Sequence, residues 1–205
     1  MQLKSLIQGK NSLIRIVLIG LTALFLSSCD SDKNKETSES DPVQDTSIIL
    51  SQDGIGPINA TTSFNMHKMT LAFSDYNVVE EVNFKDGRPF PAIRVSEGVK
   101  TVLSIIPDAS KQGIYSVIIE DNIIKNSLGH PLGTVYNEVY SYGQNEQCQP
   151  GVEDFSGKML CYAPKHPNIL YVFNGPWDNV ETGKAPPADI LQGWSLESII
   201  WRPKS

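Results

Sequence analysis

The three histidines are the side chains that could most readily support acid–base catalysis or bind a metal, because the imidazole pKa lies near neutrality, at about 6.5. They are His67, His130 and His166, and no H-x-x-x-H or H-E-x-x-H pair joins any two of them on one helix face. His67 falls within a helical pattern and is expected to be a partly buried structural residue, whereas the other two are expected in loops. A three-histidine zinc site assembled by the fold is the alternative that the sequence leaves open.

Other catalytic patterns are absent from the sequence. No serine lies in the G-x-S-x-G context of a nucleophile. The D-G-I-G stretch at 53–56 leads into Pro57 without a following βαβ pattern, so it predicts a turn rather than a dinucleotide site. The acidic pairs Glu80-Glu81 and Glu120-Asp121 lie in strand-like segments, where neighbouring side chains point to opposite faces. The sequence therefore predicts no catalytic residue, metal or cofactor, and we expect that the protein is not an enzyme.

One cysteine carries a specific chemical signal. Cys29 ends the stretch L-S-S-C, a leucine and two small residues before a cysteine, which resembles the lipobox of bacterial lipoproteins. The resemblance implies a diacylglyceryl group on the Cys29 thiol, cleavage before Cys29, and a fatty acid such as palmitate on the new amine. Several acyl chains hold a protein firmly on a membrane, since each buried CH₂ contributes ~0.8 kcal/mol.

The residues before this cysteine have the composition of a secretory signal peptide. Three basic residues and no acidic residue precede Asp30, and the apolar run 16–26 is eleven residues long. That run is too short for a membrane-spanning helix, which needs about 20 residues. The sequence thus predicts a lipoprotein signal peptide over 1–28. An uncleaved signal anchor and an ordinary cleaved signal are the alternatives.

Residues 29–46 are expected to form a disordered tether that carries the lipid. Residues 30–46 contain a single aliphatic residue, Val43, which is too little apolar surface to offset the entropy of ordering the segment. Cleavage would leave 14 basic and 23 acidic residues, a net charge of −9. Such a chain is expected to stand off anionic headgroups and not to bind nucleic acid, which needs clustered Lys and Arg. Residues 47–205 are expected to form a single periplasmic β-rich domain.

Cys148 and Cys161 would lie in an oxidising compartment if the leader directs export. Twelve residues separate them, including Pro150, Gly151 and Gly157. We expect a disulfide that closes a loop of roughly 14 residues and stabilises the fold by ~3 kcal/mol. A cysteine–histidine metal site is the alternative, although the C-x₂-C spacing of zinc sites is absent.

Strand-like segments dominate the predicted domain. Short stretches rich in Ile, Val, Tyr and Phe and bounded by turn residues predict β-strands. They cover residues 47–50, 78–84, 92–96, 99–106, 114–120, 169–173 and 195–201. Lys85-Asp86-Gly87-Arg88 predicts a hairpin turn between two of them. The fold class is therefore predicted as α+β, dominated by antiparallel strands in a sandwich-like arrangement with two short helices.

The first predicted helix covers residues 62–73, and Thr62 or Ser63 is expected to cap its start with a hydroxyl group. Its apolar face is expected to contain Met66, Met69 and Phe73, with Phe64 and Leu71 beside them.

The second predicted helix covers residues 134–142, with Thr134 as its cap and Gly143 as its stop. Its apolar face is expected to contain Val135, Val139 and Tyr142. The two helix starts, at 62–65 and 134–137, match as Thr-x-aromatic-Asn, and each follows a proline–aliphatic pair. An internal duplication of a helix-plus-strands unit is one interpretation, and chance similarity is the other.

The aromatic residues near the C-terminus are the remaining candidates for a functional surface. Trp177, Tyr171 and Trp194 flank or lie in a segment, 175–193, that is rich in Pro and Gly. Core packing is one interpretation of these side chains, and a binding face is the other.

Three motifs in the second half of the chain resemble those of a known family. They are PLGTVYNEVYS at 131–141, YVFNGPW at 171–177, and the L-x-x-W through I-I-W-R stretch at 191–202. They resemble sigma-E-regulated envelope lipoproteins of the YfeY type, a domain of unknown function, whose two cysteines also fall where this chain has its later pair. The resemblance covers most of 51–202. It implies a monomeric, mainly β periplasmic domain on a lipid anchor, made under envelope stress, and it assigns no catalytic residue.

These expectations describe a lipid-anchored periplasmic lipoprotein that binds an envelope protein or component and catalyses nothing. One alternative is a tandem helix-plus-strands interaction module resembling those of assembly-machine lipoproteins or β-lactamase inhibitor proteins. A second alternative is an uncharacterised hydrolase. Asp30 after the cysteine resembles the inner-membrane retention signal of enteric bacteria, but Ser31 follows it, so the choice between the inner and outer membrane stays open.

Overall fold

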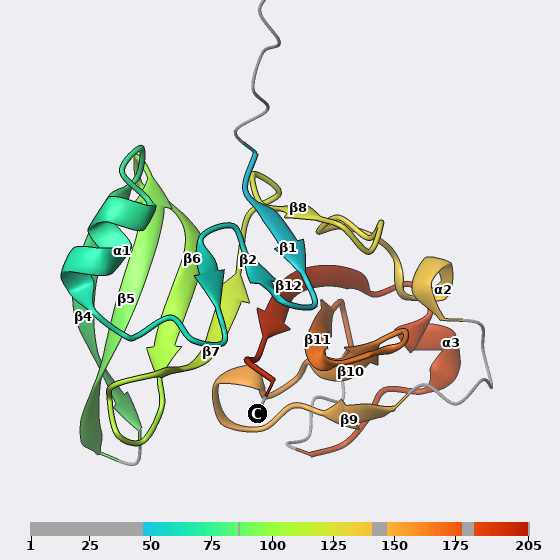
Figure 1. Cartoon of the computed structure of the whole chain (residues 1–205). Coiled ribbons are helices and arrows are strands. Elements are labelled where there is room, and N and C mark those ends of the chain that lie inside the picture. The colour runs from blue at the N-terminus through green and yellow to red at the C-terminus, as the bar shows by residue number, and fades with distance from the viewer. Residues whose placement is uncertain (1–46, 86, 141–146, 178–182, 205) are drawn as a thin grey trace, which may run out of the picture. The chain divides into compact units, whose positions relative to one another are not determined.

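The computed structural model describes residues 47–85, 87–140, 147–177 and 183–204 (Figure 1). The predicted signal peptide, the lipidation site Cys29 and the predicted tether lie outside the described residues. The described residues belong to one compact unit. Among them, no helix has the length and apolar character needed to cross a membrane.

An eight-stranded antiparallel sheet forms the centre of the domain, with the strand order β4-β5-β6-β7-β12-β11-β10-β9. Its strands are β4 (Asn77–Lys85), β5 (Arg88–Glu97), β6 (Lys100–Pro107), β7 (Ile114–Ile119), β9 (Cys148–Pro150), β10 (Met159–Ala163), β11 (His166–Asn174) and β12 (Ser195–Trp201). The sequence-based prediction of an α+β fold dominated by antiparallel strands is confirmed.

A smaller sheet has the order β3-β2-β1-β8. Its strands are β1 (Ile49–Ser51), β2 (Gly54–Ile55), β3 (Ile58–Asn59) and β8 (Lys125–Asn126). β1 and β8 pair in parallel, while the other two pairs are antiparallel. The predicted turn at 53–56 is divided by β2: Asp53 lies in the turn between β1 and β2, and Gly56 lies in the turn between β2 and β3. Gly56 has a positive φ of 52°, a conformation that glycine adopts without strain.

The helical segments are short. They are α1 (Met66–Ala72), α2 (Tyr136–Val139), α3 (Ala188–Leu191) and the 3₁₀ turn η1 (Glu153–Phe155). α1 starts later than predicted, because the Asn65 side chain caps it by accepting a hydrogen bond from the Lys68 N–H at 3.0 Å. The prediction that Thr62 or Ser63 is the cap is wrong, since Ser63 instead forms a β-bridge with Gly113.

The apolar face of α1 is narrower than predicted. Met69 and Phe73 are buried, as expected, but Leu71 is 65% exposed. Successive residues of an α-helix are rotated by about 100°, so Leu71 lies on the side opposite Met69. His67 is also exposed, so the prediction of a partly buried structural histidine there is wrong.

The second predicted helix is reduced to the single turn α2. Val135, rather than the predicted Thr134, occupies the N-cap position, and the Thr134 hydroxyl donates to a carbonyl of the preceding turn at 2.6 Å. The buried side chains of the turn are Tyr136 and Tyr140, whose rings lie 5.1 and 6.0 Å from that of Phe173. Packing of these two rings against Phe173 therefore helps to hold this one-turn segment in place. The predicted end of the helix, at 141–143, lies outside the described residues.

The eight-stranded sheet consists of two halves with the same order of elements. In the first half α1 precedes β4 to β7, and in the second half α2 precedes β9 to β12, with α3 inserted before the last strand. The last strands of the two halves pair with each other at the middle of the sheet. Their register joins Ile118 to Ile200, Ile119 to Ile199 and Val117 to Trp201. This register is symmetric about the Ile118–Ile200 pair, as in a two-fold interface.

The pairing within the halves is repeated as well. The register shifts between Ile106 and Pro107 where β6 pairs with β7, and at the corresponding place between Val172 and Phe173 where β11 pairs with β12. The Thr-x-aromatic-Asn segments also occupy equivalent places. In the first half, the Phe64 N–H donates to the Gln112 carbonyl, two residues before β7, at 2.8 Å. In the second half, the Tyr136 N–H donates to the Trp194 carbonyl, one residue before β12, at 2.8 Å. The match in sequence thus marks a structural repeat, with four strands per unit.

Candidate functional site

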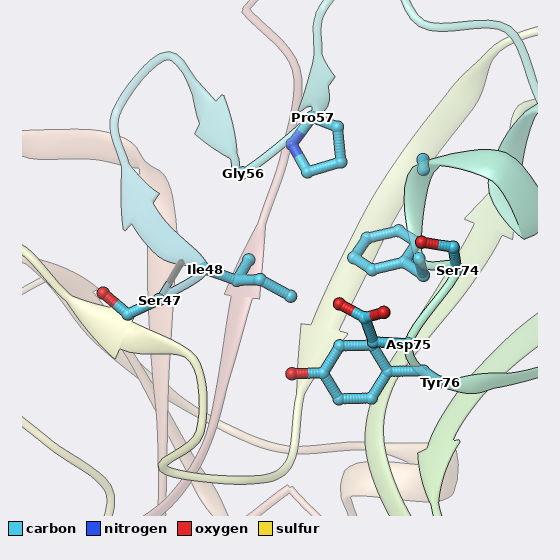
Figure 2. Close-up of a pocket in the computed structure, with 9 residues that line it drawn as sticks. Ser47, Ile48, Gly56, Pro57, Ser74, Asp75 and Tyr76 are labelled. Carbon is cyan, nitrogen blue, oxygen red and sulfur yellow. The ribbon is translucent and has the colours of Figure 1, made fainter. Parts of the chain in front are cut away.

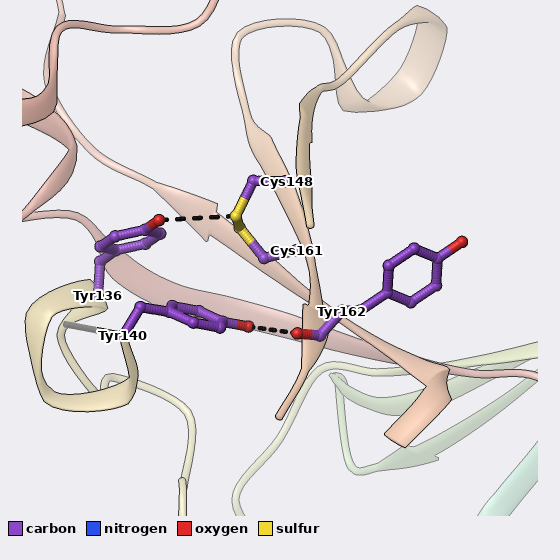
Figure 3. The surroundings of a disulfide bond; sticks show 5 residues. All are labelled: Tyr136, Tyr140, Cys148, Cys161 and Tyr162. Atoms are coloured by element: carbon purple, nitrogen blue, oxygen red, sulfur yellow. Dashed lines mark hydrogen bonds between the residues drawn. A yellow bond between two sulfur atoms is a disulfide. The ribbon is translucent and has the colours of Figure 1, made fainter. Parts of the chain in front are cut away.

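The predicted disulfide between Cys148 and Cys161 is present and joins β9 to β10 at directly opposed positions. Figure 3 shows two tyrosines of the α2 segment directed toward this region. The Tyr136 hydroxyl lies 3.6 Å from the Cys148 sulfur, and the Tyr140 hydroxyl donates to the Tyr162 carbonyl at 2.7 Å. Because both thiols are consumed by the bond, this pair does not form the alternative metal site, and it fixes one edge of the sheet.

The two interpretations of the C-terminal aromatic residues are resolved for Tyr171 and Trp194. Tyr171 is fully buried and Trp194 is 1% exposed, so core packing, and not a binding face, describes these two residues. Trp177 is partly buried against the same core. The chain makes room for Trp194 at Gly175, where an added Cβ would lie 2.2 Å from the indole ring. Gly175 is therefore required by close packing.

A polar network surrounds Tyr171. Its hydroxyl lies 3.0 Å from His130 Nδ1 and accepts a hydrogen bond from Asn126 Nδ2 at 3.1 Å, and Asn126 also donates to the His130 carbonyl at 2.7 Å. Burial lowers the pKa of His130 and raises the pKa of Tyr171. The His130 imidazole and the Tyr171 phenol thus contact each other within the domain, and Asn126 links both of them.

The other histidines do not join this network. His166 begins β11 rather than lying in a loop as predicted, and His67 lies on the exposed side of α1. Among the described residues, no group of three His, Cys, Asp or Glu side chains could hold a metal ion.

An exposed apolar surface lies on the β4–β5 arm, defined here as residues 82–85 and 87–91. Val82 and Phe84 are 64% and 70% exposed. They lie opposite Pro91 and Pro89 of β5. β4 is an edge strand of the eight-stranded sheet, and the end of this hairpin projects past α1 (Figure 1). The arm therefore combines exposed apolar side chains with a strand that, among the described residues, pairs with a strand on one side alone.

A pocket of about 300 Å³ lies between the C-terminal end of α1 and the small sheet (Figure 2). Its lining comes from three segments, 47–48, 56–57 and 72–76. Ile48, Pro57 and Phe73 supply apolar surface, while Asp75 and the Tyr76 hydroxyl supply polar groups. No described residue of the lining is basic.

Several carboxylates act on the Tyr76 side of this pocket. The pKa of Tyr76 is raised, first by burial and then by the carboxylates of Glu97, Asp75 and Asp121. Asp121 is partly compensated by an ion pair with Lys100, which also lowers the pKa of Asp121. The pocket is thus suited to a small ligand that carries positive charge.

Comparison with known proteins places this molecule in a family. Residues 37–203 match the family described as a protein of unknown function, DUF1131. Because the match spans most of the sequence, the chain belongs to this family.

A solved structure shows the same fold. The crystal structure of the uncharacterized protein YfeY from Escherichia coli is similar, with 25% sequence identity and a TM-score of 0.63. The alignment covers 77% of this chain and 99% of that chain. No curated protein matches the sequence. The sequence-based resemblance to a YfeY-like family of unknown function is therefore confirmed.

Proposed function

We propose that this protein is a lipid-anchored envelope lipoprotein whose domain binds another envelope protein and does not act as a catalyst. The signal-like leader and the lipobox-like Cys29 support export and anchoring. The observation that carries the binding role is the β4–β5 arm, where Val82 and Phe84 are exposed on an edge strand. Soluble domains usually cover or charge such an edge, because it readily pairs with another strand.

The arm suits a partner that adds a strand to β4. An extended segment would bond to the free backbone groups of the strand and place apolar side chains at alternate positions against Val82 and Phe84. Glu80 is exposed on the same face, two residues from Val82, so a basic side chain in the partner would complement it. The occupant is therefore an extended segment of another protein with alternating apolar residues and one nearby Lys or Arg.

The structural repeat favours a second candidate that is compatible with the first. Two helix-plus-four-strand units in one sheet match the tandem arrangement expected of an interaction module. The hydrolase alternative lacks such support, because the side chain of His130 contacts the Tyr171 phenol rather than a carboxylate.

Site-specific photo-crosslinking in the full-length protein, in its native membrane, tests the arm. A photoreactive residue at Phe84 is expected to give one discrete adduct, whereas the same residue at Val99, fully exposed at the opposite end of β5, gives none. The purified partner should then bind at least tenfold more weakly to the V82S/F84S variant than to wild type, with V99S unchanged. Equal labelling from both positions, no labelling, or unchanged affinity of V82S/F84S would refute the role of the arm.

The lipid anchor is tested separately by mass spectrometry of the protein extracted from intact cells. The N-terminal peptide is expected to begin at Cys29 and to carry diacylglyceryl and acyl groups. A chain that retains Met1, or an unmodified Cys29 thiol, would contradict the anchor.

A further inference from the structure

We propose that the pocket between α1 and the small sheet binds a primary alkylammonium group. This proposal is independent of the β4–β5 arm, because none of the pocket residues belongs to it. The size, lining and charge of the pocket each restrict the ligand.

The volume and the apolar lining set the size and type of the ligand. A volume of about 300 Å³ accommodates roughly ten non-hydrogen atoms, taking about 30 Å³ for one water-sized group. Ile48 projects into the space in Figure 2, and Phe73 and Pro57 also line the pocket. These surfaces would contact a short aliphatic stem, as most small-molecule pockets do.

The charge of the pocket favours a cation. The Asp75 carboxylate and the Tyr76 hydroxyl are directed toward the side of the pocket into which Ile48 projects (Figure 2). The carboxylates of Glu97 and Asp121 add negative potential at Tyr76, and Lys100 pairs with Asp121 rather than entering the lining. An anionic ligand would be repelled, whereas a cation would offset the cost of covering the Asp75 carboxylate.

The number and direction of the acceptors favour an ammonium group over a metal ion. A calcium ion takes 6–8 oxygen ligands, and the pocket offers a single carboxylate. An ammonium group has three N–H donors that point in different directions, which matches separate acceptors on Ser74, Asp75 and Tyr76. The rings of Phe73 and Tyr76, with centroids 6.4 Å apart, add aromatic surface that attracts cations.

Two sources could supply this group, a free aliphatic amine or the ethanolamine headgroup of a lipid. The pocket includes Ser47, the first described residue of the domain. If residues 30–46 form the tether that the sequence predicts, it would span ~20–25 Å, so a headgroup would lie within reach only when the domain leans toward the membrane.

Titration of the full-length protein carrying C29S with n-butylamine at pH 7, followed by amide chemical shifts in NMR, tests the site. Butylamine is protonated at this pH, and 1-butanol is its neutral isostere. Shifts are expected at Ile48, Asp75 and Tyr76 with butylamine, and binding of 1-butanol should be at least fivefold weaker. D75N should weaken butylamine binding at least fivefold, whereas D154N, which removes an exposed carboxylate on η1, should leave it unchanged.

Replacing Tyr76 separates the ring from its hydroxyl. Y76F should keep most of the affinity, and Y76A should lose most of it. Equal binding of 1-butanol and butylamine, an unchanged dissociation constant in D75N, or equal effects of D75N and D154N would overturn the proposal.

Vesicles distinguish the two sources. If the headgroup is the ligand, the C29S protein should bind phosphatidylethanolamine vesicles and not phosphatidylcholine vesicles, since the choline nitrogen has no N–H donor, and D75N should abolish the difference. Butylamine binding without this vesicle preference assigns the site to free amines.

Discussion

The two halves of the central sheet share their pairing pattern but differ at their outer edges. In the second half, the edge strand β9 is joined to β10 by the disulfide between Cys148 and Cys161. In the first half, Glu80 and Ile93 face each other at the equivalent positions, without a covalent link. The same framework thus carries one edge with a covalent link and one edge without it.

The segments that join each edge strand to the next strand also differ between the two halves. The η1 turn between β9 and β10 places Phe155 against a second apolar cluster, on the face of the sheet opposite the main core. This cluster contains Leu160, Leu170, Val172 and Ile200. The connection between β4 and β5 is instead a tight turn, in which Lys85 lies opposite Arg88, and its neighbours Val82 and Phe84 remain exposed. Phe155 and its cluster lie on one face of the sheet, whereas Val82 and Phe84 lie on the other, the face that carries Ile93 of the main core.

Substitutions in the central strands should produce the largest effects and show whether the halves unfold together. Trp201 and Ile119 occupy equivalent positions and are both buried. W201A is expected to cost about 3–5 kcal/mol and I119A about 2–5 kcal/mol of unfolding free energy, because each leaves a cavity. In urea titrations, I119A should move the tryptophan fluorescence and circular dichroism transitions together. The three tryptophans all lie in the second half, so an unmoved fluorescence transition would show that the halves unfold independently.

Removal of the disulfide should have the next largest effect. The C148S/C161S variant is expected to lose about 3 kcal/mol, because the bond restricts the unfolded chain. The loss is measured as the shift of the urea midpoint. Wild type under reducing conditions should show the same loss, and the variant should not respond to the reductant. A wild type unaffected by complete reduction would mean that the closed edge does not depend on the bond.

The buried phenol of Tyr171 distinguishes the halves in their cores, since the equivalent residue in β6 is the apolar Ile105. Y171F should cost about 1–2 kcal/mol, because His130 and Asn126 lose a hydrogen-bond partner. The measurement is again the urea midpoint at pH 7. A neutral or stabilising Y171F would show that water replaces the hydroxyl without cost.

The second half should also be the source of a pH dependence. Burial lowers the folded-state pKa of His130 below its unfolded value of about 6.5, so its neutral form stabilises the fold above that pH. This contribution is lost as the pH falls from about 6.5 through the folded-state pKa. H130Q, which cannot be protonated, should show a smaller decline in the urea midpoint between pH 7 and 5. An identical decline in wild type and variant would assign the effect to other groups.

The smallest change in unfolding free energy is expected for a substitution on the edge strand β4. F84S should change the unfolding free energy by no more than about 0.5 kcal/mol, as is usual for exposed positions. F155S should cost more, about 1 kcal/mol, because Phe155 packs against the second cluster. Comparison of the two urea midpoints tests whether the arm is dispensable for folding. A loss in F84S as large as that in F155S would show that the arm supports the fold rather than being reserved for binding.

The sequence predicted most of the long strands, because a run of residues rich in Ile, Val, Tyr and Phe is long enough to be recognised as a buried strand. All seven predicted strands overlap strands of the structure. The disulfide followed from the compartment and the spacing. The two- and three-residue strands β2, β3, β8 and β9 were not predicted, because no periodicity fits in so few residues. The five-residue strand β10 was not predicted either.

The pocket and the arm depend on information that a single sequence does not contain. The pocket is formed by segments at 47–48, 56–57 and 72–76, which the fold brings together. The exposed Val82 and Phe84 are visible as an alternating pattern, but the importance of that pattern depends on β4 lying at an edge. Tyr171 and Trp194 were ambiguous for a similar reason, because large aromatic side chains suit both a core and an interface.

The symmetric pairing of β7 with β12 has a consequence for dividing the chain. β7 and β12 pair with each other, so each half covers the innermost strand of the other half. A fragment ending before α2 would therefore leave β7 without this partner and expose Val117, Ile118 and Ile119 along its edge. Neither half is therefore expected to fold stably when it is expressed alone. Produced together as separate polypeptides, the two pieces carry the complementary register needed to reassemble as a heterodimer about the Ile118–Ile200 pair.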